Sequence, residues 1–219
     1  MLRALALAAA LTLAACGPQA DAPGAVGAPA GAPSPRTPPA PGQTAPDFTL
    51  LDTEGTPRAL SDFRGRIVVL EWADDACPYV RKHYSGSLQA LQRGAAEDGV
   101  VWLSLIPAGR ARDWKVRTGA APTHLLPDPG GRLGQAYGVR TTPELRIIDR
   151  TGRLVFAGGV DDRPTTDPAD LQGATNFVKN ALDDLMSERP LRTTIAAPYG
   201  CALGAADASP PRPGVAAER

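Results

Sequence analysis

The sequence predicts an α/β fold in which a central mixed β-sheet is flanked by helices. Two nearly continuous apolar runs, 67–72 and 99–106, are typical of strands covered on both faces. Between them, residues 78–96 carry apolar side chains every three or four positions, which predicts a helix and hence a parallel strand, helix, strand unit. Residues 144–157 predict an antiparallel hairpin, so the sheet is expected to be mixed.

Two short elements precede the parallel unit. Residues 47–51 predict a strand that runs into a turn, and residues 60–63 predict a helical turn closed by Gly65. In the helix 78–96, Pro78 suits the first turn. The inner face of that helix is expected to consist of Val80, Tyr84, Leu88, Leu91 and Ala95.

The second half of the chain is less regular. A short helix is expected near 113–117 and a helical turn at 133–137, which Gly138 ends. The hairpin strands are 144–149 and 154–157. Residues 176–187 predict a terminal amphipathic helix whose inner face consists of Phe177, Ala181, Leu182 and Leu185.

Composition excludes several classes of protein. The 219 residues include 23 basic and 23 acidic side chains, so no net positive charge is available to bind nucleic acid. Three cysteines and two histidines exclude a cysteine-rich zinc module or a disulfide-dense scaffold. We expect no cofactor. With 23 prolines and 23 glycines, part of the chain is expected to remain unfolded.

The N-terminus has the pattern of a secretory signal peptide. Residues 1–15 combine a positive charge at Arg3 with an apolar run too short to span a bilayer of about 30 Å. The stretch 13–16 resembles a bacterial lipobox, which implies lipidation of Cys16; the alternative is an ordinary secreted protein. By the same resemblance, Gly17 favours sorting to the outer membrane. We therefore expect a lipid-anchored protein of the cell envelope whose domain faces the periplasm.

The domain organisation follows from composition. Residues 16–43 are almost entirely Ala, Pro and Gly and cannot bury enough apolar surface to fold, so they predict a tether. Residues 204–219 have the same composition and predict a disordered tail. The folded domain is expected over residues 44–203.

Cys77 is the first candidate for chemistry. It follows a buried strand and opens a helix, where unpaired N–H groups and a partial positive charge stabilise a thiolate. Arg81 lies one helical turn further on and would add to that effect. The polar loop 74–76 suggests that Cys77 is partly exposed. The alternative is a buried, inert cysteine.

Further along the chain, residues 138–143 read Gly-Val-Arg-Thr-Thr-Pro and lead directly into a strand. Because a proline cannot donate to a strand ladder, Pro143 must occupy a special position such as a cis turn. This proline, the order of elements and the position of Cys77 together resemble the thioredoxin superfamily. Residues 42–50, 60–66 and 146–149, with Gly152, are similar to the redoxin branch, which comprises the alkyl hydroperoxide reductase and thiol-specific antioxidant proteins and their periplasmic thiol-disulfide relatives. Within that branch, residues 71–72, 77–80, 82–84 and 198–201 resemble a subgroup of redoxins with a single active cysteine.

The resemblance implies roles for several residues. Cys77 would be the active thiol, Pro143 the cis-proline, and Thr142 would offer backbone hydrogen bonds to a bound substrate chain. Trp72 would lie beside this substrate groove. The sequence also departs from the family, because the position of a second local cysteine holds Val80. Where peroxiredoxins have a Thr or Ser and an earlier Pro, this chain has Asp74 and Leu70, which puts efficient peroxide reduction in doubt.

If Cys16 is lipidated, Cys201 is the remaining partner for Cys77. Three alternatives stay open: Cys201 resolves or exchanges the Cys77 disulfide, it forms a permanent cross-link, or it does not pair. A different class of function is a copper or zinc chaperone with Cys77, His83 and Cys201 as ligands. Such chaperones have two cysteines in a CxxxC arrangement, and in this chain the position of the second cysteine holds Arg81. A noncatalytic thioredoxin-like interaction domain is the third class.

Other polar residues have structural interpretations. Glu71 is expected to pair with a nearby Arg or Lys, the alternative being a buried proton-transfer group, and Trp102 is expected to belong to the core. Asp161, Asp162, Asp183 and Asp184 are expected to be solvated. We conclude that the sequence predicts an envelope thiol oxidoreductase or antioxidant that acts through Cys77 on peroxide or on a thiol or disulfide protein. An electron-donor thiol protein and, through the lipid anchor, the membrane are its expected partners.

Overall fold

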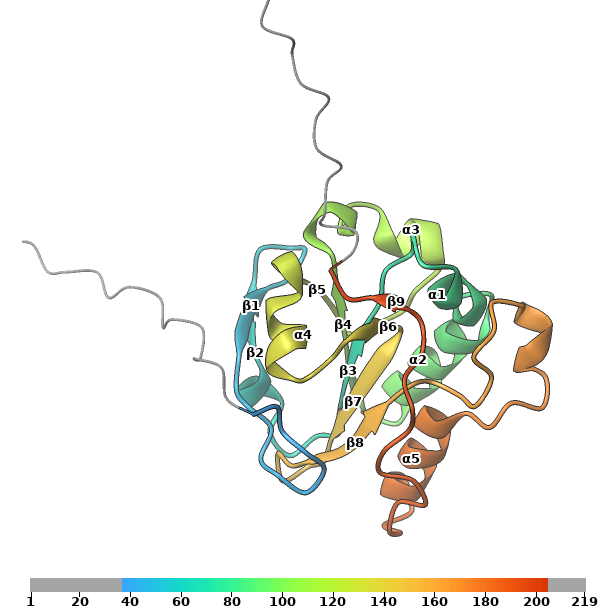
Figure 1. Cartoon of the computed structure of the whole chain (residues 1–219). Coiled ribbons are helices and arrows are strands. Elements are labelled where there is room, and N and C mark those ends of the chain that lie inside the picture. Colours follow the sequence, from blue (N-terminus) through green and yellow to red (C-terminus); the bar gives the residue numbers. More distant parts are fainter. Residues whose placement is uncertain (1–36, 205–219) are drawn as a thin grey trace, which may run out of the picture. The chain divides into compact units, whose positions relative to one another are not determined.

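The computed structural model describes residues 37–204 (Figure 1). Its centre is a five-stranded sheet with the strand order β5-β4-β3-β7-β8. β3 pairs with β4 in parallel and with β7 antiparallel, so the predicted mixed sheet is confirmed. The strands are β3 (Val68–Trp72), β4 (Val101–Ile106), β5 (His124–Pro127), β7 (Glu144–Ile148) and β8 (Leu154–Gly158).

β3 is the central strand and is buried on both faces. Its side chains alternate between two cores, as strand geometry requires. One face packs against α1 (Pro78–His83), α2 (Ser87–Glu97) and α5 (Phe177–Met186). The other face is covered by α4 (Arg132–Ala136) and by the small hairpin of β1 (Thr49–Leu51) and β2 (Pro57–Ala59) (Figure 1).

The segment 78–96 forms two helices, so the prediction of a single helix was wrong. α1 ends at His83 and α2 begins at Ser87. Gly86 precedes α2 with a φ of 136°, a conformation that breaks the helical path and that glycine tolerates best. The backbone N–H of Gly86 donates to the side chain of Gln89, which caps α2. Val80, Leu88 and Ala95 nevertheless reach the same core.

The remaining predicted elements are present with small shifts. They are η1 (Leu60–Phe63), α3 (Trp114–Thr118), α4, the β7–β8 hairpin and α5. The sequence analysis missed β2, β5, β6 (Thr141–Thr142) and β9 (Cys201–Ala202). These strands have two to four residues, too few for an alternating pattern to show. The short 3-10 helices η2 (Ala108–Arg110), η3 (Pro129–Gly131) and η4 (Pro168–Leu171) complete the described chain.

The segment that follows α5, residues 190–204, is called the C-terminal arm here. In Figure 1 it runs as an orange-red coil from α5 along the edge of the sheet to the short strand β9 beside β6. Ala157 of β8 bridges Ile195 in parallel, and β9 then pairs with β6 antiparallel. The arm therefore extends the sheet edge and ends against the loop that contains Pro143.

Asp184 shows how the arm begins. This side chain is buried, so the expectation that it is solvated was wrong. Arg192, at the start of the arm, donates to it at 2.9 Å, and Arg189, just before the arm, donates at 3.1 Å. Hydrogen bonds from Arg192 lower the pKa of Asp184 to about 2. The ion pairs thus tie the arm to the last turn of α5.

Both ends of the described region bear on the predicted boundaries. The signal peptide, Cys16 and most of the tether and of the tail lie outside the described residues. The domain begins a few residues before 44, because the N–H of Gly42 donates to Leu154 and the N–H of Leu154 donates to Gln43. Within residues 37–204, no helix has the length and apolar character needed to cross a membrane.

Gly158→Ala is expected to loosen the arm. A Cβ at residue 158 would lie 2.1 Å from the carbonyl oxygen of Ala196, and the φ of 152° is itself unfavourable for alanine. We expect the free energy of unfolding in urea to fall by about 2 kcal/mol. In Gly55→Ala, where the added Cβ meets open space, the backbone conformation alone should cost about 1 kcal/mol. Equal losses in the two variants would contradict close packing of the arm on β8.

Candidate active site

Cys77 lies where the central strand passes into the first helix. The loop after β3 turns through Asp74, whose carbonyl accepts the N–H of Cys77 at 2.9 Å and whose side chain accepts the N–H of Ala76 at 2.9 Å. Cys77 is the N-cap residue of α1, and Pro78 occupies its first turn. The position at a strand-to-helix junction is the one that the sequence predicted.

Cys77 forms a disulfide with Cys201, 124 positions along the chain. Of the three alternatives for Cys201, the unpaired one is therefore wrong. The expectation that Cys77 is partly exposed was also wrong, because only 2% of the residue is accessible. Cys201 and the backbone of Thr142 cover the sulfur.

The Thr142–Pro143 peptide bond is cis, as the sequence suggested. The carbonyl oxygen of Thr142 lies 3.4 Å from the Cys77 sulfur. In the disulfide this sulfur has no hydrogen, so the approach is a contact, whereas a reduced Cys77 thiol could donate to the same oxygen. Thr142 is also the residue opposite Cys201 in the β6–β9 pair. The disulfide, the cis-proline and the arm thus meet at one point.

A buried ion pair supports the cis-proline loop, and the sequence analysis missed it. One carboxylate oxygen of Glu144 accepts the backbone N–H groups of Arg140 and Thr141, each at 3.1 Å. Its other oxygen accepts the guanidinium of Arg146 at 2.8 Å. Arg146 also donates to the carbonyl of Tyr137 at 3.1 Å. These bonds fix the loop that presents Thr142 to Cys77.

Arg81 belongs to α1, and its side chain extends back to the loop that precedes Cys77. Its guanidinium donates to the carbonyl oxygens of Asp75 and Ala76, at 3.1 and 2.7 Å. Arg117 of α3 donates to the carboxylate of Asp75 at 2.5 Å, an interaction that raises the pKa of Arg117. Arginine side chains from two helices therefore stabilise the turn that precedes Cys77.

Trp72 is the last residue of β3 and lies close to Leu203 of the arm. Its indole N–H donates to Asp128 at 3.0 Å, and the carboxylate of Asp128 also accepts the N–H groups of Leu133 and Gly134. Trp72, Thr142 and Leu203 line a cavity of about 10 Å³, too small for a ligand. The groove that the resemblance implies is thus filled by the arm in this disulfide form.

Glu71 does not pair with a base, so that expectation was wrong. It is completely buried and accepts hydrogen bonds from four neutral donors. These donors are Tyr84, Gln92, Trp102 and Ser104, at 2.7–3.0 Å. Burial raises the pKa of Glu71, and the four hydrogen bonds oppose that shift. Because Tyr84 follows α1, the bond from its hydroxyl ties the end of that helix to β3.

His83 is a buried residue and lies apart from the two cysteines. Its Nε2 lies 3.0 Å from the hydroxyl of Tyr199. Burial lowers the pKa of His83 to about 4, so its 4.0 Å approach to Asp161 is not an ion pair at neutral pH. Within residues 37–204 no three His, Cys, Asp or Glu side chains are arranged to hold a metal ion. The copper or zinc alternative therefore lacks its ligand set in this region.

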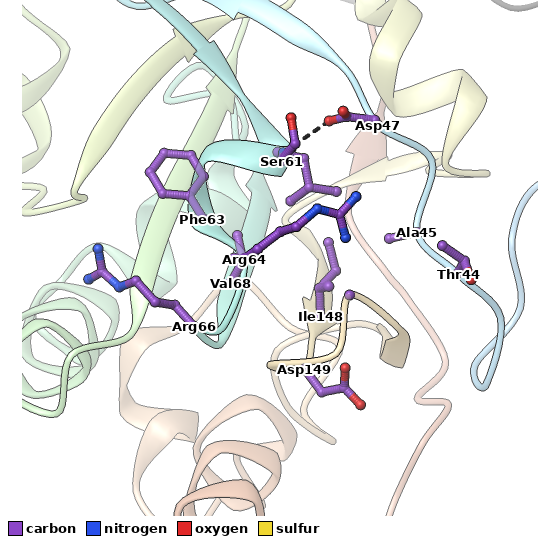
Figure 2. Close-up of a pocket in the computed structure, with 12 residues that line it drawn as sticks. Thr44, Ala45, Asp47, Ser61, Phe63, Arg64, Arg66, Val68, Ile148 and Asp149 are labelled. Atoms are coloured by element: carbon purple, nitrogen blue, oxygen red, sulfur yellow. Dashed lines mark hydrogen bonds between the residues drawn. The ribbon is translucent and has the colours of Figure 1, made fainter.

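A second cavity lies at the other end of the sheet. It measures about 30 Å³ and is lined by residues from the start of β3 and the end of β7, among them Val68 and Ile148. Figure 2 shows this cavity, with Arg64 extending across it and the N–H of Ser61 bonded to Asp47. Cys77 lies beyond the opposite end of β3, so this cavity is separate from the Cys77–Cys201 disulfide.

Comparisons with known proteins bear on the family and the fold of the chain. The AhpC/TSA family model matches residues 41–157. A conserved protein from Geobacillus kaustophilus is 23% identical with a TM-score of 0.62, over 74% of this chain and 89% of that one. A hypothetical protein from Sinorhizobium meliloti is 22% identical with a TM-score of 0.61, over 78% and 96%. No curated protein matches significantly. The fold is thioredoxin-like, as the sequence predicted.

Glu71→Gln is expected to destabilise the protein by about 1–3 kcal/mol. The amide would place N–H groups against the N–H and O–H donors that now bond the carboxylate. Equilibrium unfolding in urea measures the loss. Glu97→Gln makes the same change at an exposed position of α2 and should alter stability by less than about 0.5 kcal/mol.

The loss in Glu71→Gln should also depend on pH. The pKa of Glu71 is raised in the folded state, so the unfolded chain loses this proton first as the pH rises above about 4.5. The wild type therefore loses stability above that pH, and Glu71→Gln lacks this loss. A stability difference that widened, rather than narrowed, on raising the pH would contradict the raised pKa.

Proposed function

The chain belongs to the AhpC/TSA family, and from that premise we propose that it is a thiol-disulfide oxidoreductase whose Cys77–Cys201 pair cycles between disulfide and dithiol. One observation carries the proposal: the family's active-cysteine position is already joined to a second cysteine beside the Thr142–Pro143 loop. In that position the disulfide lies at the N-terminus of α1 and against the Thr142 carbonyl.

The exchange is balanced in thiols and electrons. A thiolate of a donor protein attacks one sulfur of the Cys77–Cys201 disulfide, forms a mixed disulfide and releases the other sulfur as a thiolate. The second donor thiol then attacks the mixed disulfide, so the donor is oxidised and Cys77 and Cys201 become thiols. Transfer of the two electrons to a substrate disulfide reverses these steps and restores the Cys77–Cys201 bond.

Disulfide exchange fits the site better than peroxide reduction. By the family resemblance, residue 74 is the position where a peroxiredoxin carries the hydroxyl of a Thr or Ser. Here it is Asp74, whose carboxylate accepts the N–H of Ala76 and lies 3.7 Å from Arg110. Cys77 is almost inaccessible in this form, whereas Cys201 is only partly buried, so a donor thiolate can approach the disulfide at Cys201.

We further propose that the protein works in the bacterial cell envelope, anchored by a lipid on Cys16 and facing the periplasm. The support is the sequence pattern of residues 1–16 and the presence of a disulfide between distant cysteines, since disulfides form and persist in oxidising compartments.

Cys16→Ser should move the protein from the membrane fraction to the soluble fraction after cell lysis. Retention in the membrane fraction would contradict a lipid anchor on this residue.

The redox cycle can be followed by intact mass. After reduction, the wild type exposed to oxidised glutathione should lose two hydrogens as the Cys77–Cys201 bond reforms. Cys201→Ser should instead stop as a glutathione adduct on Cys77. An additional sample receives one equivalent of hydrogen peroxide; rapid loss of two hydrogens there, with a sulfenic acid in Cys201→Ser, would favour peroxide reduction. A wild-type disulfide that neither reduces nor reforms would contradict both reactions and leave an interaction domain.

A further inference from the structure

The C-terminal arm is anchored to the domain on both sides of Cys201. Tyr199 lies two residues before the cysteine and Leu203 two residues after it, and they contact different parts of the domain. Tyr199 enters a polar cluster beside the end of α1, whereas Leu203 packs against α4 and Trp72. The strand that carries Cys201 is therefore held at two points besides the disulfide.

The first anchor is a buried polar cluster that the redox chemistry does not use. The hydroxyl of Tyr199 donates to Asp161 and lies 3.0 Å from Nε2 of His83 and 3.5 Å from Nζ of Lys82. Lys82 in turn lies 3.4 Å from Asp161 and 5.5 Å from the centre of the Tyr199 ring. Asp161 was expected to be solvated, but it is 2% exposed. Its burial comes from this contact with the arm and with α1.

Removing the Tyr199 hydroxyl from this cluster would be costly. His83 would lose the partner of its Nε2, and its Nδ1 already has none among the described residues. The carboxylate of Asp161 would keep Lys82 and the N–H of Arg163 but lose the tyrosine donor. Buried polar groups that lose a partner are destabilised by more than the value of an exposed hydrogen bond. The cluster thus favours the docked position of Tyr199.

The second anchor is apolar and closely fitted. A Cβ at Gly134 would lie 2.5 Å from Cδ2 of Leu203 and 2.9 Å from Nε1 of Trp72, so the Leu203 side chain fills the space that two glycines leave on α4 and η3. The other glycine is Gly131, where a Cβ would lie 3.0 Å from Leu203. The N–H of Leu203 also donates to the carbonyl of Arg140 at 2.8 Å.

Between the anchors, Gly200 lets the strand lie directly on β6. Its φ is 140°, and a Cβ at this position would lie 2.0 Å from the carbonyl oxygen of Thr142. That oxygen is the one in contact with the Cys77 sulfur. The same close approach therefore places Cys201 opposite Thr142 and within bonding reach of Cys77.

We propose that Tyr199 and Leu203 are positioning residues that keep Cys201 beside Cys77 whether or not the two sulfurs are bonded. This inference rests on the proposed function. The arm then supplies the second cysteine that the helix lacks at Val80. Reoxidation is an intramolecular step between two thiols that are already adjacent, and such steps have high effective concentrations because no large loop must be closed again.

The equilibrium with glutathione measures this effective concentration. For the reaction of the disulfide with two glutathione molecules, Tyr199→Phe should shift the equilibrium toward the dithiol by up to about tenfold, the effect of one buried hydrogen bond to a charged group. The disulfide holds the weakened arm in place, whereas the reduced arm can leave its site and so avoids the cost of the lost bond. Tyr79→Phe is the matched control, because its ring meets Tyr199 edge-on and its hydroxyl makes no hydrogen bond within the described residues. It should change the equilibrium by less than about twofold.

Leu203→Ala tests the second anchor and gives a variant that leaves the polar cluster intact. It should shift the equilibrium in the same direction by about tenfold or more. Leu51→Ala makes the same truncation at a side chain that is 59% exposed and should have no effect. Equilibria equal to that of the wild type in both Tyr199→Phe and Leu203→Ala would overturn the proposal.

Amide hydrogen exchange separates this inference from the proposed function. In Cys201→Ser no disulfide can form, yet the N–H of Leu203 should remain protected, and adding Tyr199→Phe should reduce that protection about tenfold. An unprotected Leu203 N–H in Cys201→Ser would show that the disulfide alone holds the arm and would overturn the proposal. If the wild-type disulfide does not exchange with glutathione, the proposed function fails, while protection in Cys201→Ser still supports the anchors.

Discussion

The structure depends on the contact of three distant segments at the Thr142 carbonyl. The end of β3 brings Cys77, the cis-proline loop brings Thr142, and the arm brings Cys201, although the cysteines are 124 positions apart. The approach is so close that only glycine fits at residue 200. Each segment therefore has to be held accurately, and much of the buried polar structure does this.

Each of the three segments is fixed by a different carboxylate. Glu71 bonds Tyr84 and so ties the end of α1 to β3. Glu144, paired with Arg146, accepts two N–H groups of the cis-proline loop. Asp161 accepts the Tyr199 hydroxyl from the arm. Buried carboxylates are stable only with several donors, so each of them specifies one arrangement of its neighbours rather than merely adding stability.

This arrangement explains how a thioredoxin-like domain with a single cysteine on its first helix can carry a disulfide. The second sulfur comes from the C-terminal arm, which pairs with the cis-proline loop as an extra strand and fills the space beside Trp72. The match to the AhpC/TSA family and the position of Cys77 at a strand-to-helix junction agree with that view. The metal alternative fits poorly, because His83 serves the arm and not the cysteines.

The sequence by itself determined the mixed α/β fold, the position of Cys77, and the special proline at 143, because periodicity and proline stereochemistry are local properties. Only the tertiary structure decided that Cys201 pairs with Cys77, since a pairing across 124 residues leaves no local signal. The same reason applies to Glu71, Asp161 and Asp184. Their partners come from remote segments, so neither their burial nor the covering of Cys77 could be inferred from neighbours in the sequence.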